Sequence, residues 1–235
     1  MAGVILTTQN IAGFANANFP LAARLTADLG GPPVFLDRDT VMAAIGEGLA
    51  GAAKGARNFV YLTVSTGIGG AIVADGRMIR GASNTAGELG HFPVGFDREV
   101  RCRCGSFGCV EAYAAGRNLA EAYGVDDASI VYAKAAAGDA RAAALVARAE
   151  AALENLAVGI VNALNPERIV VGGSVAEHEP AHVLEPMRRA IAERAFQVPA
   201  AAVAVVPSAL GGDVSIIGAA LAARDRAAGE GTWFL

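Results

Sequence analysis

The chain has 235 residues, of which 54% are hydrophobic and 18% are charged, so it is long enough to form one large domain or two smaller ones with substantial cores. Its net charge of -4 comes without a basic stretch that would neutralise phosphates, which argues against a nucleic acid as a partner of this chain alone. The sequence has neither a cationic start ahead of an apolar stretch nor an apolar run approaching the roughly 18 residues that span a bilayer, so we expect a cytoplasmic protein with no membrane partner.

Short apolar runs alternate with helical patterns in the first part of the chain. We expect strands at residues 3–7, 32–36, 58–65 and 71–74, and helices at residues 21–30 and 40–55. The sequence STGIGG separates the last two strands, and a DGR turn follows them. This order predicts a hairpin with a glycine-rich tip.

The same alternation continues to the end of the chain. We expect helices at residues 109–124, 139–164, 185–196 and 216–226, and strands at residues 168–173 and 201–206. Asn165 and Pro166 stop the longest of these helices, and two glycines end the strand that follows it. Strands that alternate with helices in this way predict an α/β fold.

All three cysteines of the chain, Cys102, Cys104 and Cys109, fall within eight positions. An odd number of cysteines in a reducing compartment favours metal ligation over disulfides. The two glycines between Cys104 and Cys109 permit the sharp turns that would bring the thiols together. His91 is the only histidine in the central part of the chain, so it is the natural fourth ligand of a closed, structural zinc site. The alternative is a set of small buried cysteines and a core histidine.

His178 and His182 have the spacing of a metal-binding pair on a helix. Pro180 lies between them, however, and the sequence offers no evident third ligand. We therefore expect a solvated pair at the surface.

Three linked motifs resemble those of the ROK family of repressors and sugar kinases. They are STGIGGAIV from Ser65, GELGH ending at His91, and the run C-x-C-G-x-x-G-C-x-E from Cys102 to Glu111. The segments PERIVVGGSV, at residues 166–175, and IIGAALAA look like the family's adenosine-side strand and closing helix, so the resemblance covers nearly the whole chain. It implies the ribonuclease H-like fold shared by hexokinase, actin and the heat-shock chaperone ATPases, in which sugar and nucleotide meet between two domains.

The resemblance implies sugar-kinase chemistry for four side chains. A kinase needs a carboxylate that accepts the proton of the sugar hydroxyl while the phosphoryl group of ATP, bound with Mg2+, is transferred. Asp39 matches the family's catalytic aspartate and follows the strand expected at residues 32–36; its alternative role is to cap the next helix. Glu88, His91 and Glu111 match residues that bind the sugar, with surface carboxylates as the alternative for the two glutamates.

Two glycine-rich turns are candidates for binding ATP. Gly67, Gly69 and Gly70 lie at the expected hairpin tip, where backbone N–H groups could approach phosphate oxygens without obstruction from side chains. Gly172 and Gly173 end a strand against which an adenosine could lie. Turns without any ligand are the alternative for both sets.

The chain departs from the family's pattern at its amino end. Family kinases carry an aspartate-glycine-glycine-threonine turn long before the catalytic aspartate, whereas only 38 residues precede Asp39 and the chain contains no such turn. We expect residues 1–54, completed by the C-terminal helix at residues 213–235, to be the remnant of the first domain, and residues 55–212 to form the zinc- and nucleotide-side domain. A shortened sheet leaves strand edges without partners, so we expect either a start codon further upstream or a homodimer.

The residues around Asp39 also depart from the family's N-D-A-N pattern. Arg38 and Val41 replace both asparagines, which removes an amide that would bind the sugar, and Arg38 would favour the ionised form of Asp39. Two functions stay open: ATP-dependent phosphorylation of a hexose or N-acetylhexosamine hydroxyl with Asp39 as the base, and a catalytically silent sugar-binding or regulatory protein. The sequence does not identify the sugar.

Overall fold

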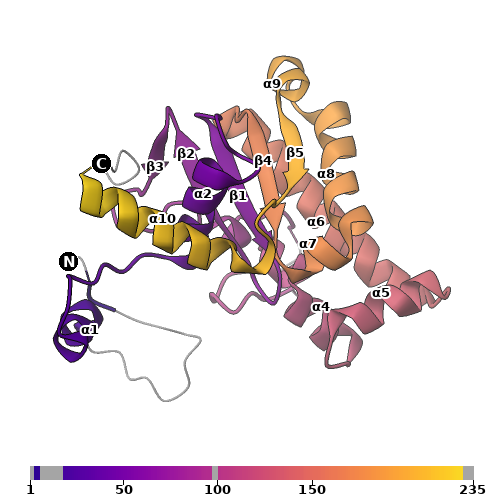
Figure 1. Ribbon diagram of the computed structural model, residues 1–235. Helices are drawn as coiled ribbons and strands as arrows, with labels where there is room; N and C mark the ends of the chain where they lie inside the picture. The colour runs from indigo at the N-terminus through magenta and orange to yellow at the C-terminus, as the bar shows by residue number, and fades with distance from the viewer. Residues whose placement is uncertain (1–2, 6–17, 97–99, 230–235) are drawn as a thin grey trace. The chain divides into compact units, whose positions relative to one another are not determined.

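The computed structural model describes residues 3–5, 18–96 and 100–229, and the chain divides into two compact units, Met1–Asp39 and Thr40–Leu235 (Figure 1). Among the described residues, no helix combines the length and the apolar character that a membrane crossing requires. The domain boundary expected between residues 54 and 55 stays a prediction.

The first unit contains the helix α1, which spans Leu21–Leu29. It ends at Gly30, whose φ of 57° is left-handed as in many helix C-terminal caps, so the predicted helix is confirmed. Ile5 and Phe19 pair through two backbone hydrogen bonds of 2.9 Å, and the remainder of the strand predicted at residues 3–7 lies outside the described residues.

The buried strand predicted at residues 32–36 is wrong. Residues 33–38 have no regular secondary structure, and Phe35 is 55% exposed. An apolar run becomes a strand only where a neighbouring strand completes its backbone hydrogen bonds. No such neighbour occurs among the described residues of this unit.

A five-stranded mixed sheet forms the centre of the second unit, with the strand order β3-β2-β1-β4-β5. Its strands are β1 (Phe59–Val64), β2 (Ile68–Ala74), β3 (Arg77–Ile79), β4 (Arg168–Gly172) and β5 (Ala204–Pro207). β1, β2 and β3 are antiparallel neighbours, whereas β4 pairs in parallel with β1 and with β5. The predicted hairpin and the strand at residues 168–173 are confirmed. The last strand begins later than predicted because residues 197–202 are helical.

Helices lie on both faces of this sheet (Figure 1). From Asp39 onward the described helices are α2 (Asp39–Ala50), α3 (Val110–Ala114), α4 (Gly116–Tyr123), α5 (Ala128–Ala136), α6 (Ala140–Leu164), α7 (Ser174–His178), α8 (Pro180–Arg194), α9 (Gln197–Ala202) and α10 (Val214–Ala228), with 3-10 turns η1 (Leu89–His91) and η2 (Gly211–Asp213). The predicted α2, α6 and α10 are confirmed. Asp139 caps α6 by accepting a hydrogen bond from the Ala142 N–H at 2.8 Å, and Asn165 ends it with a left-handed φ of 45°.

The side chains of β1 alternate between two hydrophobic cores. Val60, Leu62 and Val64 are buried in a cluster with residues of α6 and α8, and Phe59 and Tyr61 are buried in a second cluster with residues of α2 and α10. Successive side chains of a strand point to opposite faces, so one strand contributes to both cores. The sheet is therefore the middle of three layers, which confirms the α/β class.

Glu47 is fully buried in α2 and ties this helix to the segment that precedes α10. Its Oε1 accepts hydrogen bonds from the Ser208 hydroxyl at 2.5 Å and from the N–H groups of Ala209 and Leu210 at 3.0 and 3.1 Å. Its Oε2 accepts a hydrogen bond from the Ala52 N–H at 2.5 Å. A carboxylate is tolerated inside a protein when donors surround it in this way, so these hydrogen bonds fix α2 to the chain before α10.

The single helix predicted at residues 109–124 is in fact two helices, because α3 ends before Ala115, whose ψ of 140° is extended. The Gly116 N–H donates a hydrogen bond to the Ser65 carbonyl at 2.8 Å. A Cβ atom on Gly116 would approach that carbonyl oxygen to 3.2 Å, so glycine permits this close contact. The contact with the hairpin, which is distant in the sequence, overrides the local helical pattern.

The sequence pattern predicts neither α5 nor α7, and α8 begins at Pro180 rather than at residue 185. Proline suits the first turn of a helix because the N–H that it lacks would have no intrahelical partner there. The Asp127 side chain caps α5 by accepting a hydrogen bond from the Ser129 N–H at 2.7 Å. Asp127 is therefore the residue in the sequence that marks the beginning of α5.

Candidate functional site

Four side chains of the second unit converge as the sequence predicts. Ligand atoms of His91, Cys102, Cys104 and Cys109 all lie within 4.8 Å of one another. The Sγ atoms of Cys104 and Cys109 are 3.7 Å apart, and Cys102 Sγ is 3.6 Å from His91 Nδ1. A tetrahedral ion with ordinary metal–sulfur and metal–nitrogen bonds separates its ligands by about 3.8 Å and about 3.6 Å respectively. The sulfur atoms are too far apart for a disulfide bond of about 2.05 Å, so the cluster fits a metal ion.

The loop that carries the cysteines is shaped by its own backbone hydrogen bonds. The Cys102 N–H donates to the Ser106 carbonyl at 2.9 Å, and the Gly105 N–H donates to the Cys102 carbonyl at 3.0 Å. Gly105 and Gly108 have left-handed φ angles of 90° and 68°, and a Cβ atom on Gly108 would collide with the Gly95 carbonyl. The two glycines therefore permit the turns that the sequence predicts.

Burial affects the acidity of the cysteine thiols. It raises the pKa of Cys109 to about 12, with a further contribution from the neighbouring Cys104 thiol. Burial likewise raises the pKa of Cys102. Metal ions bind the thiolate form, so a metal ion must displace these protons, and its affinity must fall with falling pH.

Glu111 connects the cysteine cluster to the hairpin between β1 and β2. It lies in the first turn of α3, two residues after Cys109, and its Oε2 accepts a hydrogen bond from the Ile68 N–H at 3.0 Å. Its Oε1 is 4.0 Å from Cys102 Sγ. A Cβ atom on Gly67 would lie 3.1 Å from Oε2, so the bare backbone of Gly67 leaves room for this carboxylate. Glu111 is thus held in a fixed orientation at the hairpin tip.

Glu88 and His91 belong to one short segment that lies against β2. Glu88 is exposed and immediately precedes η1, whose last residue is His91. A Cβ atom on Gly90 would collide with the Ile68 carbonyl, so the absence of a side chain allows η1 to contact the β2 backbone. This contact places His91 at the cysteines while Glu88 stays accessible to a ligand.

Of the three glycines predicted at the hairpin tip, one lies there and two lie in a strand. Gly67 lies in the turn, whereas Gly69 and Gly70 are residues of β2. A Cβ atom on Gly69 would lie 2.9 Å from the Thr40 side chain, and one on Gly70 would lie 2.6 Å from the Leu89 side chain. Close packing therefore accounts for glycine at both strand positions, and their contact with phosphate stays a prediction.

Gly172 and Gly173 lie beside the hairpin tip because β4 runs parallel to β1. Gly172 pairs with Thr63, and Gly173 has a left-handed φ of 94°. The hydroxyls of Ser65 and Ser174, which follow β1 and β4, are 2.9 Å apart. The two turns predicted from distant parts of the sequence therefore adjoin each other at the same end of the sheet.

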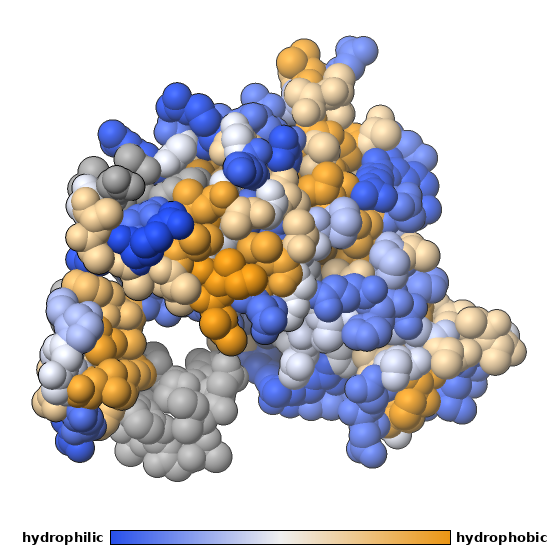
Figure 2. All heavy atoms as spheres, in the orientation of Figure 1, coloured by the Kyte–Doolittle hydropathy of each residue, from blue (hydrophilic) through white to orange (hydrophobic). Residues whose placement is uncertain are grey.

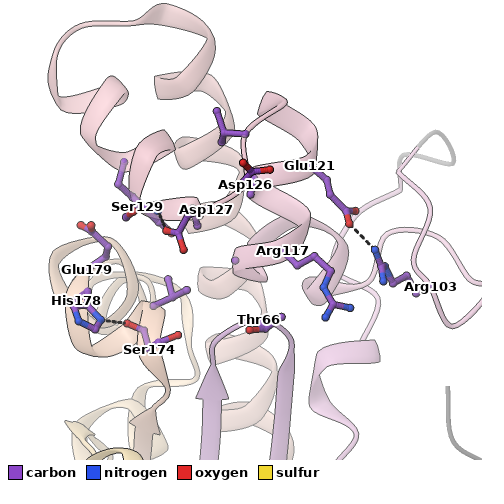
Figure 3. A pocket seen from close by; sticks show the side chains of 16 residues that line it. Thr66, Arg103, Arg117, Glu121, Asp126, Asp127, Ser129, Ser174, His178 and Glu179 are labelled. Atoms are coloured by element: carbon purple, nitrogen blue, oxygen red, sulfur yellow. Dashed lines mark hydrogen bonds and ion pairs between the residues drawn. The ribbon is translucent and has the colours of Figure 1, made fainter. Parts of the chain in front are cut away.

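A cavity of about 670 Å³ opens next to these two turns (Figure 3). Thr66 of the hairpin tip and Ser174 of α7 contribute to its wall, and the remaining polar lining residues include Arg103, Arg117, Glu121, Asp126, Asp127, Ser129, Tyr132, His178 and Glu179. Its size is typical of sites for small molecules, which measure about 300–1,000 Å³. The sequence does not indicate that these residues line one cavity, because they come from separate segments of the chain.

His178 is exposed and His182 is partly buried, and each has its Nδ1 near a protein oxygen atom. His178 Nδ1 lies 2.7 Å from the Ser174 carbonyl oxygen, and His182 Nδ1 lies 2.6 Å from a carboxylate oxygen of Glu150. Within the described part of the chain, neither histidine joins a metal cluster.

Asp39 is the first residue of α2 and the acidic residue in the first turn of that helix, where a negative charge interacts favourably with the helix dipole. It belongs to the first compact unit, and the other predicted site residues belong to the second. Its catalytic role stays a prediction.

Comparisons with known proteins relate the whole chain to one family. The chain matches the ROK family over residues 2–226. A glucokinase from Halalkalibacterium halodurans is 33% identical over 220 residues, which cover 86% of this chain and 66% of the relative. An N-acetylmannosamine kinase from Citrobacter koseri is 38% identical over 174 residues, which cover 72% of this chain and 58% of the relative. The chain therefore spans less than two thirds of the length of either relative.

A solved structure resembles the chain over nearly its full length. It is the crystal structure of a ROK family glucokinase from Streptomyces griseus in complex with glucose and AMPPNP, with a TM-score of 0.76 and 26% sequence identity. The match covers 95% of this chain and 77% of that chain. This similarity confirms the fold class of actin and hexokinase that the motifs imply.

Proposed function

This chain belongs to the ROK family, and from that membership we propose that it acts as an ATP-dependent kinase of a hexose or an N-acetylhexosamine. The names of the two kinase relatives support this class of substrate. The observation that carries the proposal is the position of Glu111, which links the cysteine cluster to the hairpin tip beside the second glycine turn. Groups suited to a sugar and groups suited to a nucleotide thereby lie in one region of the second unit.

On the sugar side, Glu88 and Glu111 would accept hydrogen bonds from sugar hydroxyls, and the ring of His91 would make a further polar contact. Three cysteine sulfur atoms and an imidazole within 4.8 Å of one another suit zinc, and we propose zinc as the resident metal. The ion would take no part in the reaction. It would hold the loop rigid, so that His91 and Glu111 are oriented before the sugar arrives.

On the nucleotide side, the backbone at Gly67 and at the turn of Gly172 and Gly173 would face the ATP molecule. A Mg2+ ion bound with ATP would neutralise part of the phosphate charge. In the reaction, the sugar oxygen bonds to the γ-phosphorus as the bond to ADP breaks, and Asp39 accepts the hydroxyl proton.

The main alternative is a protein that binds the sugar without phosphorylating it. This alternative stays open because Asp39, the proposed base, belongs to the first compact unit, whereas the residues proposed to bind the sugar and the nucleotide belong to the second. The homodimer and the cytoplasmic location stay predictions. The homodimer is supported by apolar side chains that gather on the surface near the start of α10, where Ile216 is 71% exposed (Figure 2).

The test is an assay of ADP release by the zinc-loaded chain with glucose, N-acetylglucosamine, N-acetylmannosamine, fructose and allose. Turnover with at least one sugar, abolished by Asp39→Asn, is expected because the amide cannot accept the hydroxyl proton. Thermal stabilisation by a sugar without any release of ADP would favour the silent sugar-binding protein instead.

A further inference from the structure

The cavity beside the hairpin tip has an uneven distribution of charge. In Figure 3, Arg103, which is paired with Glu121, and Arg117 lie to one side, with the guanidinium group of Arg117 near Thr66, and Asp127 and Glu179 lie on the other side. An anionic group of a ligand is attracted to the guanidinium groups and repelled from the carboxylates of Asp127 and Glu179. The distribution of charge therefore favours a ligand whose anionic end lies at Arg103 and Arg117.

Arg103 reaches this cavity from the metal cluster itself. It stands between Cys102 and Cys104, so a bound ion would hold the chain on both sides of it. Its Nη2 atom lies 2.5 Å from Oε1 of Glu121, a residue of α4 that also lines the cavity. The metal-binding loop thus forms part of the cavity wall, and the ion pair with Glu121 aims the guanidinium group.

Arg117 is positioned by the hairpin. It follows Gly116, whose N–H donates to the Ser65 carbonyl at 2.8 Å, and its own N–H donates to the Thr66 carbonyl at 3.4 Å. The start of α4 is therefore attached to the tip that contains Gly67. This attachment places a second cation beside the backbone predicted to meet phosphates.

We propose that Arg103 and Arg117 bind the phosphate groups of the nucleotide, and that occupancy of the metal cluster raises nucleotide affinity through Arg103. This inference rests on the proposed kinase function. A guanidinium group matches the geometry of phosphate oxygens through paired N–H donors, whereas the opposite carboxylates accept hydrogen bonds from the ribose hydroxyls. Release of the metal ion frees the loop, so that Arg103 no longer holds its position at the cavity.

The experiment measures the binding of ADP and of adenosine to the full chain by calorimetry. Zinc-loaded and metal-depleted protein are compared for the unchanged chain, for Arg103→Ala and for Arg101→Ala. Arg101 is the matched control, because it is an exposed arginine on the other side of Cys102, its guanidinium carbon lies 4.7 Å from the Phe107 ring centroid, and it does not line the cavity. Zinc content and thermal unfolding establish that both variants keep the metal and the fold.

Arg103→Ala is expected to lower the affinity for ADP about five-fold, which is the size of effect typical of an exposed charge pair. The affinity for adenosine is expected to stay unchanged. Arg101→Ala is expected to change the affinity for neither ligand. Metal depletion is expected to lower the ADP affinity of the unchanged chain by a similar factor and to have little further effect on the ADP affinity of Arg103→Ala.

Four outcomes overturn the inference. If Arg103→Ala leaves the affinity for ADP unchanged, or lowers the affinities for ADP and adenosine equally, Arg103 does not contact the phosphates. Either result leaves the proposed kinase function intact. An equal effect of metal depletion in the unchanged chain and in Arg103→Ala removes the coupling to the metal. Failure of the unchanged zinc-loaded chain to bind either ligand overturns the kinase function together with the inference.

Discussion

Replacement of Cys109 by serine removes one of the proposed metal ligands with little change in size. Cys109 is fully buried, immediately precedes α3, and has its Sγ 3.7 Å from that of Cys104. Serine preserves the packing but does not replace thiolate as a zinc ligand. With free zinc about a thousand-fold above its dissociation constant, loss of binding removes about 4 kcal/mol of stability, which lowers Tm by about 8–16 °C for a chain of this size.

The assay combines metal analysis with calorimetry. The unchanged chain is expected to contain one zinc ion and Cys109→Ser none, and their Tm values are expected to converge when both proteins are measured in the presence of a chelator. The comparison in chelator separates loss of the metal from any effect of the hydroxyl on packing. The reasoning would be refuted by a purified chain without zinc, or by Cys109→Ser with full zinc content and an unchanged Tm.

The remaining predictions concern the stability of the second unit. Glu47→Ala is expected to lower the free energy of unfolding by about 3 kcal/mol or more in urea titrations, because it leaves buried donors without an acceptor; Glu185→Ala, at a surface ion pair, should leave the midpoint unchanged. Gly173→Ala should lower the free energy of unfolding by about 2 kcal/mol more than Gly138→Ala does. Both glycines have left-handed φ angles, of 94° and 90°, but only at Gly173 would an added Cβ lie 2.6 Å from oxygen atoms of β1. Equal losses of stability in the two variants would contradict this explanation. Hydrogen bonds from two backbone N–H groups lower the pKa of Glu167, so its stabilising contribution is present above its ordinary pKa of 4.5 and is lost as the pH falls below it. Glu167→Gln should therefore flatten the acid side of the curve of Tm against pH, and an unaltered curve would speak against this role.

Local signals in the sequence determined the convergence of the three cysteines and several elements. Cys102, Cys104 and Cys109 lie within one short loop, and its two glycines supply the necessary turns, so their convergence depends on few residues. The ends of α6 are likewise marked by a capping Asp139 and a left-handed Asn165. Such signals act within a few residues and do not depend on the rest of the fold.

Other features followed from contacts that a local pattern does not contain. The helix predicted at residues 109–124 is interrupted where Gly116 meets the Ser65 carbonyl, and the apolar run at residues 32–36 forms no strand. The sequence does not show that an added Cβ atom on Gly70 would lie 2.6 Å from the Leu89 side chain, a packing reason for glycine at this position. In each case, a partner far along the chain, or its absence among the described residues, outweighs the local preference.

The sequence by itself determined the family, the α/β class and the convergence of the histidine and the three cysteines that could hold a metal ion. Only the tertiary structure placed the two glycine turns together and put Arg103 and Arg117 in the wall of one cavity. The physical reason is the parallel pairing of β1 with β4, whose residues are more than 100 positions apart. Such a pairing depends on the packing of the whole sheet between its helices, and no spacing within either segment specifies it.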